Sequence, residues 1–85
     1  MKEFIEAVVK MLVDYPDEVA IREVGSQQIS VFELRLNPSD VGKVIGKSGH
    51  TIMAIRTLLT NIGVKHNKRV MLEIIEPEHR AVAVA

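Results

Sequence analysis

The chain has 85 residues, the length of one small domain. Apolar residues make up 47% of it and cysteine is absent, so a packed core is feasible while disulfides and cysteine-based zinc sites are excluded. The formal net charge is zero, yet residues 41–72 hold six basic residues and no acidic one. This segregation is typical of proteins with a polyanionic partner, although a solvated basic face would explain it equally well.

The amino-terminal residues do not resemble a targeting signal. Residues 1–14 carry Glu3, Glu6 and Lys10 between their apolar side chains, which interrupts any signal-peptide core. No apolar run in the chain approaches the roughly 20 residues that a membrane-spanning helix needs. We therefore expect a cytoplasmic protein without a membrane partner.

The first part of the chain predicts a helix followed by a hairpin. Residues 2–13 place apolar side chains at the spacing of one buried helix face, and Pro16 ends that helix. Residues 18–24 and 29–36 alternate as half-buried strands do, and the short polar turn between them favours an antiparallel pair. The second strand should direct alternate residues to opposite faces: Phe32, Leu34 and Leu36 to one, and Val31, Glu33 and Arg35 to the other.

Two predicted helices follow the hairpin. Asn37 is a suitable N-cap, and Asp40, three positions later, is placed to complete a capping box by bonding back to the first amide. The helix that begins here is short because Gly46 interrupts it. A second helix is predicted for residues 50–62, with Gly63 as its left-handed stop.

The carboxyl-terminal part adds one strand and a tail. Residues 69–75 have the pattern of a strand, whereas residues 78–85 have no clear pattern and should form a tail after a single domain of residues 1–77. A right-handed crossover through the two helices would make the second and third strands parallel neighbours. The expected fold is α+β, with a three-stranded mixed sheet and three helices packed on one of its faces.

The most specific pattern lies between the two central helices. It consists of an aliphatic pair, a Gly-x-x-Gly loop and a further aliphatic residue, namely Val44, Ile45, Gly46, Gly49 and Ile52. This pattern resembles the KH-domain signature, and the α-β-β-α-α-β order resembles the type II arrangement of bacterial KH proteins. The stretch that begins at Asn37, together with the chain length, resembles the small stand-alone KH proteins of the KhpA family.

The resemblance implies partners and a role. The KhpA family is described as RNA chaperones that form homodimers and associate with a larger, multidomain KH protein of the KhpB type, with links to post-transcriptional regulation and cell shape. It also implies that bases lie in an aliphatic groove beside the glycine loop. Only two Phe, one Tyr and no Trp are present, so an aromatic stacking platform is not expected.

The chemistry of the glycine loop supports an anion site independently of the resemblance. Gly46 and Gly49 allow a sharp turn that exposes backbone amides, and the following helix directs its positive end to the same place. Lys47 adds a charge and Ser48 a hydroxyl donor. We predict that these four residues bind the backbone of single-stranded RNA, about four nucleotides per domain. Further groove or electrostatic candidates are Lys43, Val44, Ile45, His50, Ile52 and Arg56, although the aliphatic ones fit a plain core as well.

Other functions receive less support from the sequence. A nucleotide-binding P-loop needs four residues between its glycines, and only three separate Gly42 from Gly46. His50, His66 and His79 fall in different predicted elements without a matching nucleophile, so neither an enzyme nor a metal or cofactor is expected. Two alternatives stay open: a helix-hairpin-helix type of DNA binder, and a KH-fold module for protein interaction or dimerisation only.

Overall fold

A computed structural model of the protein describes residues 1–75. Its helices and strands follow the predicted order: α1 (Lys2–Leu12), β1 (Ala20–Gly25), β2 (Ile29–Arg35), α2 (Val41–Ile45), α3 (His50–Lys65) and β3 (Arg69–Ile74). Short 3-10 turns precede β1, α2 and α3, at η1 (Pro16–Glu18), η2 (Pro38–Asp40) and η3 (Lys47–Gly49). The predicted tail at residues 78–85 and the predicted domain boundary at residue 77 lie outside the described residues.

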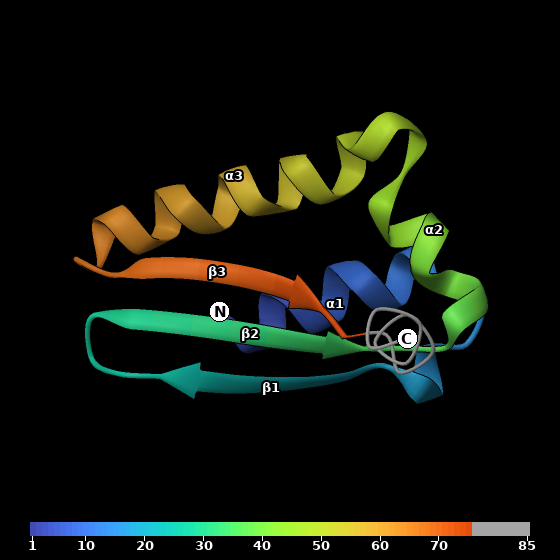
Figure 1. Ribbon diagram of the computed structural model, residues 1–85, viewed down its shortest axis with the longest axis horizontal. Coiled ribbons are helices and arrows are strands. Elements are labelled where there is room, and N and C mark those ends of the chain that lie inside the picture. Colours follow the sequence, from blue (N-terminus) through green and yellow to red (C-terminus); the bar gives the residue numbers. More distant parts are fainter. Residues whose placement is uncertain (76–85) are drawn as a thin grey trace, which may run out of the picture.

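The three strands form one mixed sheet in the order β1-β2-β3. β1 pairs with β2 in antiparallel fashion, and β2 pairs with β3 in parallel, with Phe32 opposite both Glu23 and Leu72. The helices α2 and α3 form the crossover between the parallel strands, and α3 runs alongside β3 (Figure 1). The predicted α+β fold and its mixed sheet are therefore confirmed.

The core lies between one face of the sheet and the helices. In β2 the residues Ser30, Phe32 and Leu34 are buried and alternate with partly exposed neighbours, as the period of two requires. The largest fully buried apolar side chains come from both layers: Ile5 and Val9 of α1, Phe32 and Leu34 of β2, Val44 of α2, Leu59 of α3 and Leu72 of β3. Val31, Glu33 and Arg35 consequently belong to the opposite face of the sheet, which no described helix covers.

The prediction that Gly63 ends the second central helix is wrong. α3 continues to Lys65, and Asn67, with a φ of 57°, takes the left-handed position after it. The Lys68 amide donates to the Gly63 carbonyl at 2.7 Å and the Asn67 amide to the Val64 carbonyl at 3.2 Å, the two bonds of a Schellman motif. Gly63 itself is buried, and a Cβ there would lie 2.6 Å from the Lys68 carbonyl oxygen, so this glycine permits close packing of α3 on the start of β3.

Within the described residues, none of the helices is both long enough and apolar enough to cross a bilayer.

Candidate nucleic-acid interface

The glycine loop joins α2 to α3 and depends on unusual backbone angles. Gly46 has φ 78° and ψ 173°, a region essentially restricted to glycine, and a Cβ there would lie 2.6 Å from the Cβ of Thr51. Gly49 has φ 76° and ψ 10°, yet a Cβ there would have no neighbour within 4 Å. Ser48 is left-handed as well, with φ 56°. Gly46 is thus required by both conformation and space, and Gly49 by conformation alone.

This backbone leaves two amides available at the tip of the loop. The Gly46 amide donates to the Gly42 carbonyl at 2.9 Å, the Gly49 amide to the Gly46 carbonyl at 3.1 Å, and the His50 amide to the Lys47 carbonyl. In residues 1–75 the amides of Lys47 and Ser48 have no hydrogen-bond acceptor. They lie just before the amino-terminal end of the 16-residue helix α3, whose dipole favours negative charge at that end. The loop can therefore bind an anion through main-chain donors.

The side chains at the loop tip add to this positive field. Lys47, Ser48 and His50 are exposed, and none of them takes part in an ion pair among the residues that the structure covers. Lys47 therefore keeps an unneutralised ammonium beside the two available amides. His66 belongs to the opposite end of α3, and His79 lies outside the described range.

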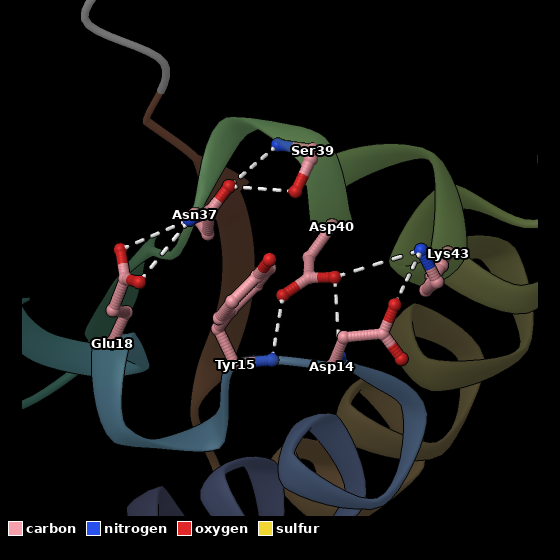
Figure 2. A network of polar contacts seen from close by, with 7 residues as sticks. All are labelled: Asp14, Tyr15, Glu18, Asn37, Ser39, Asp40 and Lys43. Atoms are coloured by element: carbon pink, nitrogen blue, oxygen red, sulfur yellow. Dashed lines mark hydrogen bonds and ion pairs between the residues drawn. The ribbon is translucent and has the colours of Figure 1, made fainter.

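Lys43 has a different environment from the one that the sequence predicts. Its Nζ lies 3.2 Å from Oδ2 of Asp14 and 3.7 Å from Oδ1 of Asp40 (Figure 2). The hydrogen bond to Asp14 is the main reason why the pKa of Lys43 is raised above its ordinary value of 10.5. Because two acids neutralise its charge, Lys43 contributes little to the attraction of a phosphate and instead helps to fix the start of α2.

Asp40 does not complete the capping box that the sequence predicts. Its carboxylate is fully buried and accepts hydrogen bonds from the amides of Asp14 and Tyr15, both at 3.1 Å (Figure 2). The N-cap role of Asn37 is confirmed, because its Oδ1 accepts the Ser39 amide at 2.9 Å. Asp40 thus ties the segment after α1 to the beginning of α2, and this connection holds the helix that carries the glycine loop.

The aliphatic candidates are divided between the core and the surface. Val44 is 0% exposed and Ile52 is 6% exposed, so both belong to the core in this structure. Ile45 is only partly buried and packs against the core edge. The β2 residues Val31, Glu33 and Arg35 lie on the sheet face opposite the helices, because they alternate with the core side chains along the strand.

The structure shows a groove that the sequence interpretation missed, between α3 and the free edge of β3. Two hollows in the surface are lined by residues of both α3 and β3, and a third is lined by α3 alone; Thr60 of α3 lines all three. The amides of the odd-numbered residues Arg69 and Ile75 donate to the strand side occupied by β2. Main-chain groups alternate in direction along a strand, so those of Leu72 point to the free edge of β3. Arg56 covers this edge: its Nε and Nη2 donate to the Leu72 carbonyl at 3.2 and 3.0 Å.

Arg56 is therefore an anchor between α3 and β3 as well as an exposed basic side chain. Lys43, Lys47, His50 and Arg56 are all exposed, but in the described part of the chain only Lys43 is paired with acids. Of the other three, Arg56 belongs to the groove, and Lys47 and His50 belong to its loop end. The groove could have been suspected from the crossover topology, because β3 must be an edge strand if it pairs only with β2.

Comparisons with known proteins point to one family. A sequence model of the KH domain of KhpA and KhpB matches residues 2–74. An RNA-binding protein KhpA from Clostridium acetobutylicum is 51% identical over 75 residues, which cover 88% of this chain and 100% of that protein. KhpA proteins from Chlamydia pneumoniae and Aquifex aeolicus are 50% and 47% identical over 76 residues, which cover 89% of this chain and 97% and 96% of those proteins.

No solved structure was found to match the chain. The match to the family model extends over all the helices and strands described above, and over the Gly46–Gly49 loop. The chain therefore belongs to the KhpA/KhpB family of KH-domain proteins.

Proposed function

We propose that this protein is a non-catalytic RNA-binding protein that holds the backbone of single-stranded RNA at the Gly46–Gly49 loop. The observation that carries the proposal is the pair of available amides at Lys47 and Ser48, next to an unpaired ammonium group and the positive end of α3. Phosphate oxygens are suitable acceptors for this arrangement. The printed names of the relatives, RNA-binding protein KhpA, support the same ligand.

The groove between α3 and β3 gives the bases a place beside the loop. α3 is 16 residues long and so extends for about 24 Å at 1.5 Å per residue. A KH domain clamps about four nucleotides, a length that this groove accommodates. The duplex-DNA alternative is less favoured, because base edges reach the β3 strand only when they are not paired with a second strand.

The test is a double substitution at the loop tip, Lys47→Asp with Ser48→Asp. Both side chains are exposed, so the fold should survive, while two carboxylates beside the available amides repel phosphate. We expect the affinity for a single-stranded RNA to fall at least about tenfold. Fluorescence anisotropy measures the affinity, and circular dichroism with thermal melting measures the fold.

A charge-matched control keeps the same net charge away from the loop. Lys2→Asp with Ala7→Asp changes two exposed positions of α1 and should leave RNA affinity within about twofold at moderate salt. If the loop variant binds RNA as tightly as the parent protein, the loop is not the clamp. If both variants lose affinity equally, general charge rather than the loop binds the RNA.

Self-association is part of the proposal. Leu58 of α3 is 50% exposed and lines none of the three hollows, so it offers apolar surface that a second chain could bury without closing the groove. A homodimer would carry two loops and raise affinity through effective concentration. The family resemblance extends this to chaperone activity and to a heterodimer with a KhpB-type protein. Light scattering on the purified chain measures its mass in solution and so tests directly whether it forms a homodimer.

A further inference from the structure

The sheet face opposite the helices carries an apolar row near the β1–β2 turn. Val31 of β2 is paired with Val24 of β1 on one side and with Met71 of β3 on the other, so the three side chains lie next to one another. Ile29 comes two positions before Val31 and therefore belongs to the same face. Met71 is 44% exposed and Ile29 is 41% exposed. This part of the face therefore offers apolar surface to an occupant.

The next row of the same face carries charges. Glu33 of β2 is paired with Arg22 of β1 and with Glu73 of β3, which places two carboxylates on neighbouring strands. The buried Oε1 atom of Glu33 accepts no hydrogen bond within residues 1–75, and its one ion-pair partner there is Nη1 of Arg35, at 3.6 Å. Neither Arg22 nor Glu73 forms an ion pair in the same range. The two carboxylates therefore suit a further cation that can donate hydrogen bonds.

The sequence that follows β3 has a complementary pattern. β3 ends at Ile74, and residues 76–85 are Glu-Pro-Glu-His-Arg-Ala-Val-Ala-Val-Ala. The family model ends at residue 74, so this segment lies beyond the match to KhpA and KhpB. Alternate positions hold an acid, a base and two apolar residues, namely Glu78, Arg80, Val82 and Val84. Side chains two positions apart in an extended segment point the same way, so one surface can contact all four.

These four side chains come in the same order as the rows of the sheet face. From the end of β3 backwards, the face carries first Arg35, then the two glutamates, and then the apolar row. Successive rows are two residues apart, about 7 Å, which is also the spacing of alternate side chains in an extended segment. Three residue steps from Ile75 to Glu78 span about 10 Å, the usual distance between a sheet and a layer packed on it.

Pro77 favours a departure from the sheet at this point. The amides of Arg69 and Ile75 donate to β2, so the amide of residue 77 would be the next odd-numbered donor in the ladder. Proline has no amide hydrogen, and the ladder cannot continue through it. The chain after Ile75 is therefore free to turn onto the face instead of lengthening β3.

We propose that the sheet face opposite the helices binds residues 78–85 of the same chain as an extended segment, with Arg80 between Glu33 and Glu73. Val82 then covers the apolar row and Glu78 meets Arg35. The net charges also attract: the face holds three Arg and two Glu, whereas residues 76–85 hold two Glu and one Arg. The inference does not depend on RNA binding, because the glycine loop belongs to the helical layer.

The experiment attaches a nitroxide spin label to the end of this segment in the full chain. The protein has no cysteine, so Ala85→Cys provides a single site for the label. Nuclear magnetic resonance of the isotope-labelled protein then reports which amides lie near it. The amide signals of Ile29 and Val31 should lose most of their intensity, whereas those of Thr57 and Leu58, exposed on α3, should keep theirs.

Two charge reversals test the pairing of Arg80. In the spin-labelled protein, Arg80→Glu sets an acid against two carboxylates, so the signal of Ile29 should recover. Glu73→Arg combined with Arg80→Glu restores an opposite pair, and the intensity loss should return. The control Lys65→Glu makes the same change of charge at an exposed position of α3 and should leave the loss unchanged. Thermal melting monitors the fold of each variant.

A mixed sample distinguishes the chain's own segment from that of a second copy. It combines spin-labelled protein without the isotope and isotope-labelled protein without the spin label. Binding within one chain predicts full signal intensity in this mixture. An intensity loss as large as in the singly prepared sample would overturn the inference, because a second chain would then occupy the face. Full intensity at Ile29 in the spin-labelled parent, or a loss that Arg80→Glu leaves in place, would overturn it as well.

Discussion

Alanine substitutions at the two loop glycines should have unequal effects on stability. At Gly46 the backbone angles, φ 78° and ψ 173°, belong to a region that costs a residue with a Cβ about 1–3 kcal/mol. The added Cβ would also lie 2.6 Å from the Thr51 Cβ and 3.0 Å from its backbone nitrogen, and such overpacking costs about 1–3 kcal/mol more. Gly46→Ala should therefore lower the free energy of unfolding by about 2–6 kcal/mol.

At Gly49 only the left-handed conformation opposes a side chain. Its φ of 76° and ψ of 10° cost about 1–2 kcal/mol with a Cβ, and no atom within 4 Å would be displaced. Alanine also reduces the freedom of the unfolded chain, which returns about 0.4–1 kcal/mol. We therefore expect Gly49→Ala to cost about 1 kcal/mol, a small part of the roughly 5–15 kcal/mol that stabilises a domain of this size.

Urea denaturation followed by circular dichroism measures both free energies on the same scale. The denaturant slope should be the same for the parent protein and both variants, since the surface exposed on unfolding hardly changes. Equal destabilisation by the two substitutions would refute the reasoning, because both the backbone region and the space around the Cβ oppose a side chain more strongly at Gly46 than at Gly49. A cost below about 1 kcal/mol for Gly46→Ala would refute it too, since conformation alone should exceed that value.

Two further predictions concern the polar network below the loop. Asp40→Ala removes a buried acceptor of the Asp14 and Tyr15 amides and should lower the free energy of unfolding by about 2–4 kcal/mol in the same urea assay. The control Asp17→Ala removes an exposed acid in η1 and should change the free energy of unfolding by less than about 0.5 kcal/mol. Equal effects of the two substitutions would contradict the burial argument. The pKa of Lys43 is raised above 10.5 by Asp14, so the stability that its charge contributes is fully present below about pH 10.5 and is lost as the pH rises further. The difference in melting temperature between the parent and Lys43→Met should therefore be constant between about pH 7 and pH 10 and shrink above it, and a difference that stays unchanged to about pH 12 would contradict the assignment.

Much of the fold could be predicted from short-range patterns. The apolar spacing of residues 2–13 and the alternation of residues 29–36 each depend on one period. The predicted strand face is buried, and so are Ile5 and Val9 of the predicted helix face, whereas Phe4 of that face is 37% exposed. The order of elements, with the handedness rule for crossovers, then gave the parallel pairing of β2 with β3. The glycine loop was visible because the angles of Gly46 and Gly49 leave few alternatives to glycine.

The errors have a common origin. Asp40 was expected to bond to its own helix start, but its partners are amides 25 and 26 positions earlier in the chain. Gly63 was expected to end a helix, but its missing side chain makes room for the start of β3. In both cases a local rule allowed one role, and a neighbour from another element decided the actual one.

The sequence by itself therefore determined the elements, their order and the glycine loop, because turn geometry and periodicity act over a few residues. Only the tertiary structure decided which charges remain available: Lys43 is neutralised by Asp14 and Asp40, whereas Lys47 is not. It also decided that Arg56 meets the edge of β3, 16 positions further along the chain. Such contacts join residues that are distant in sequence, and no local pattern records them.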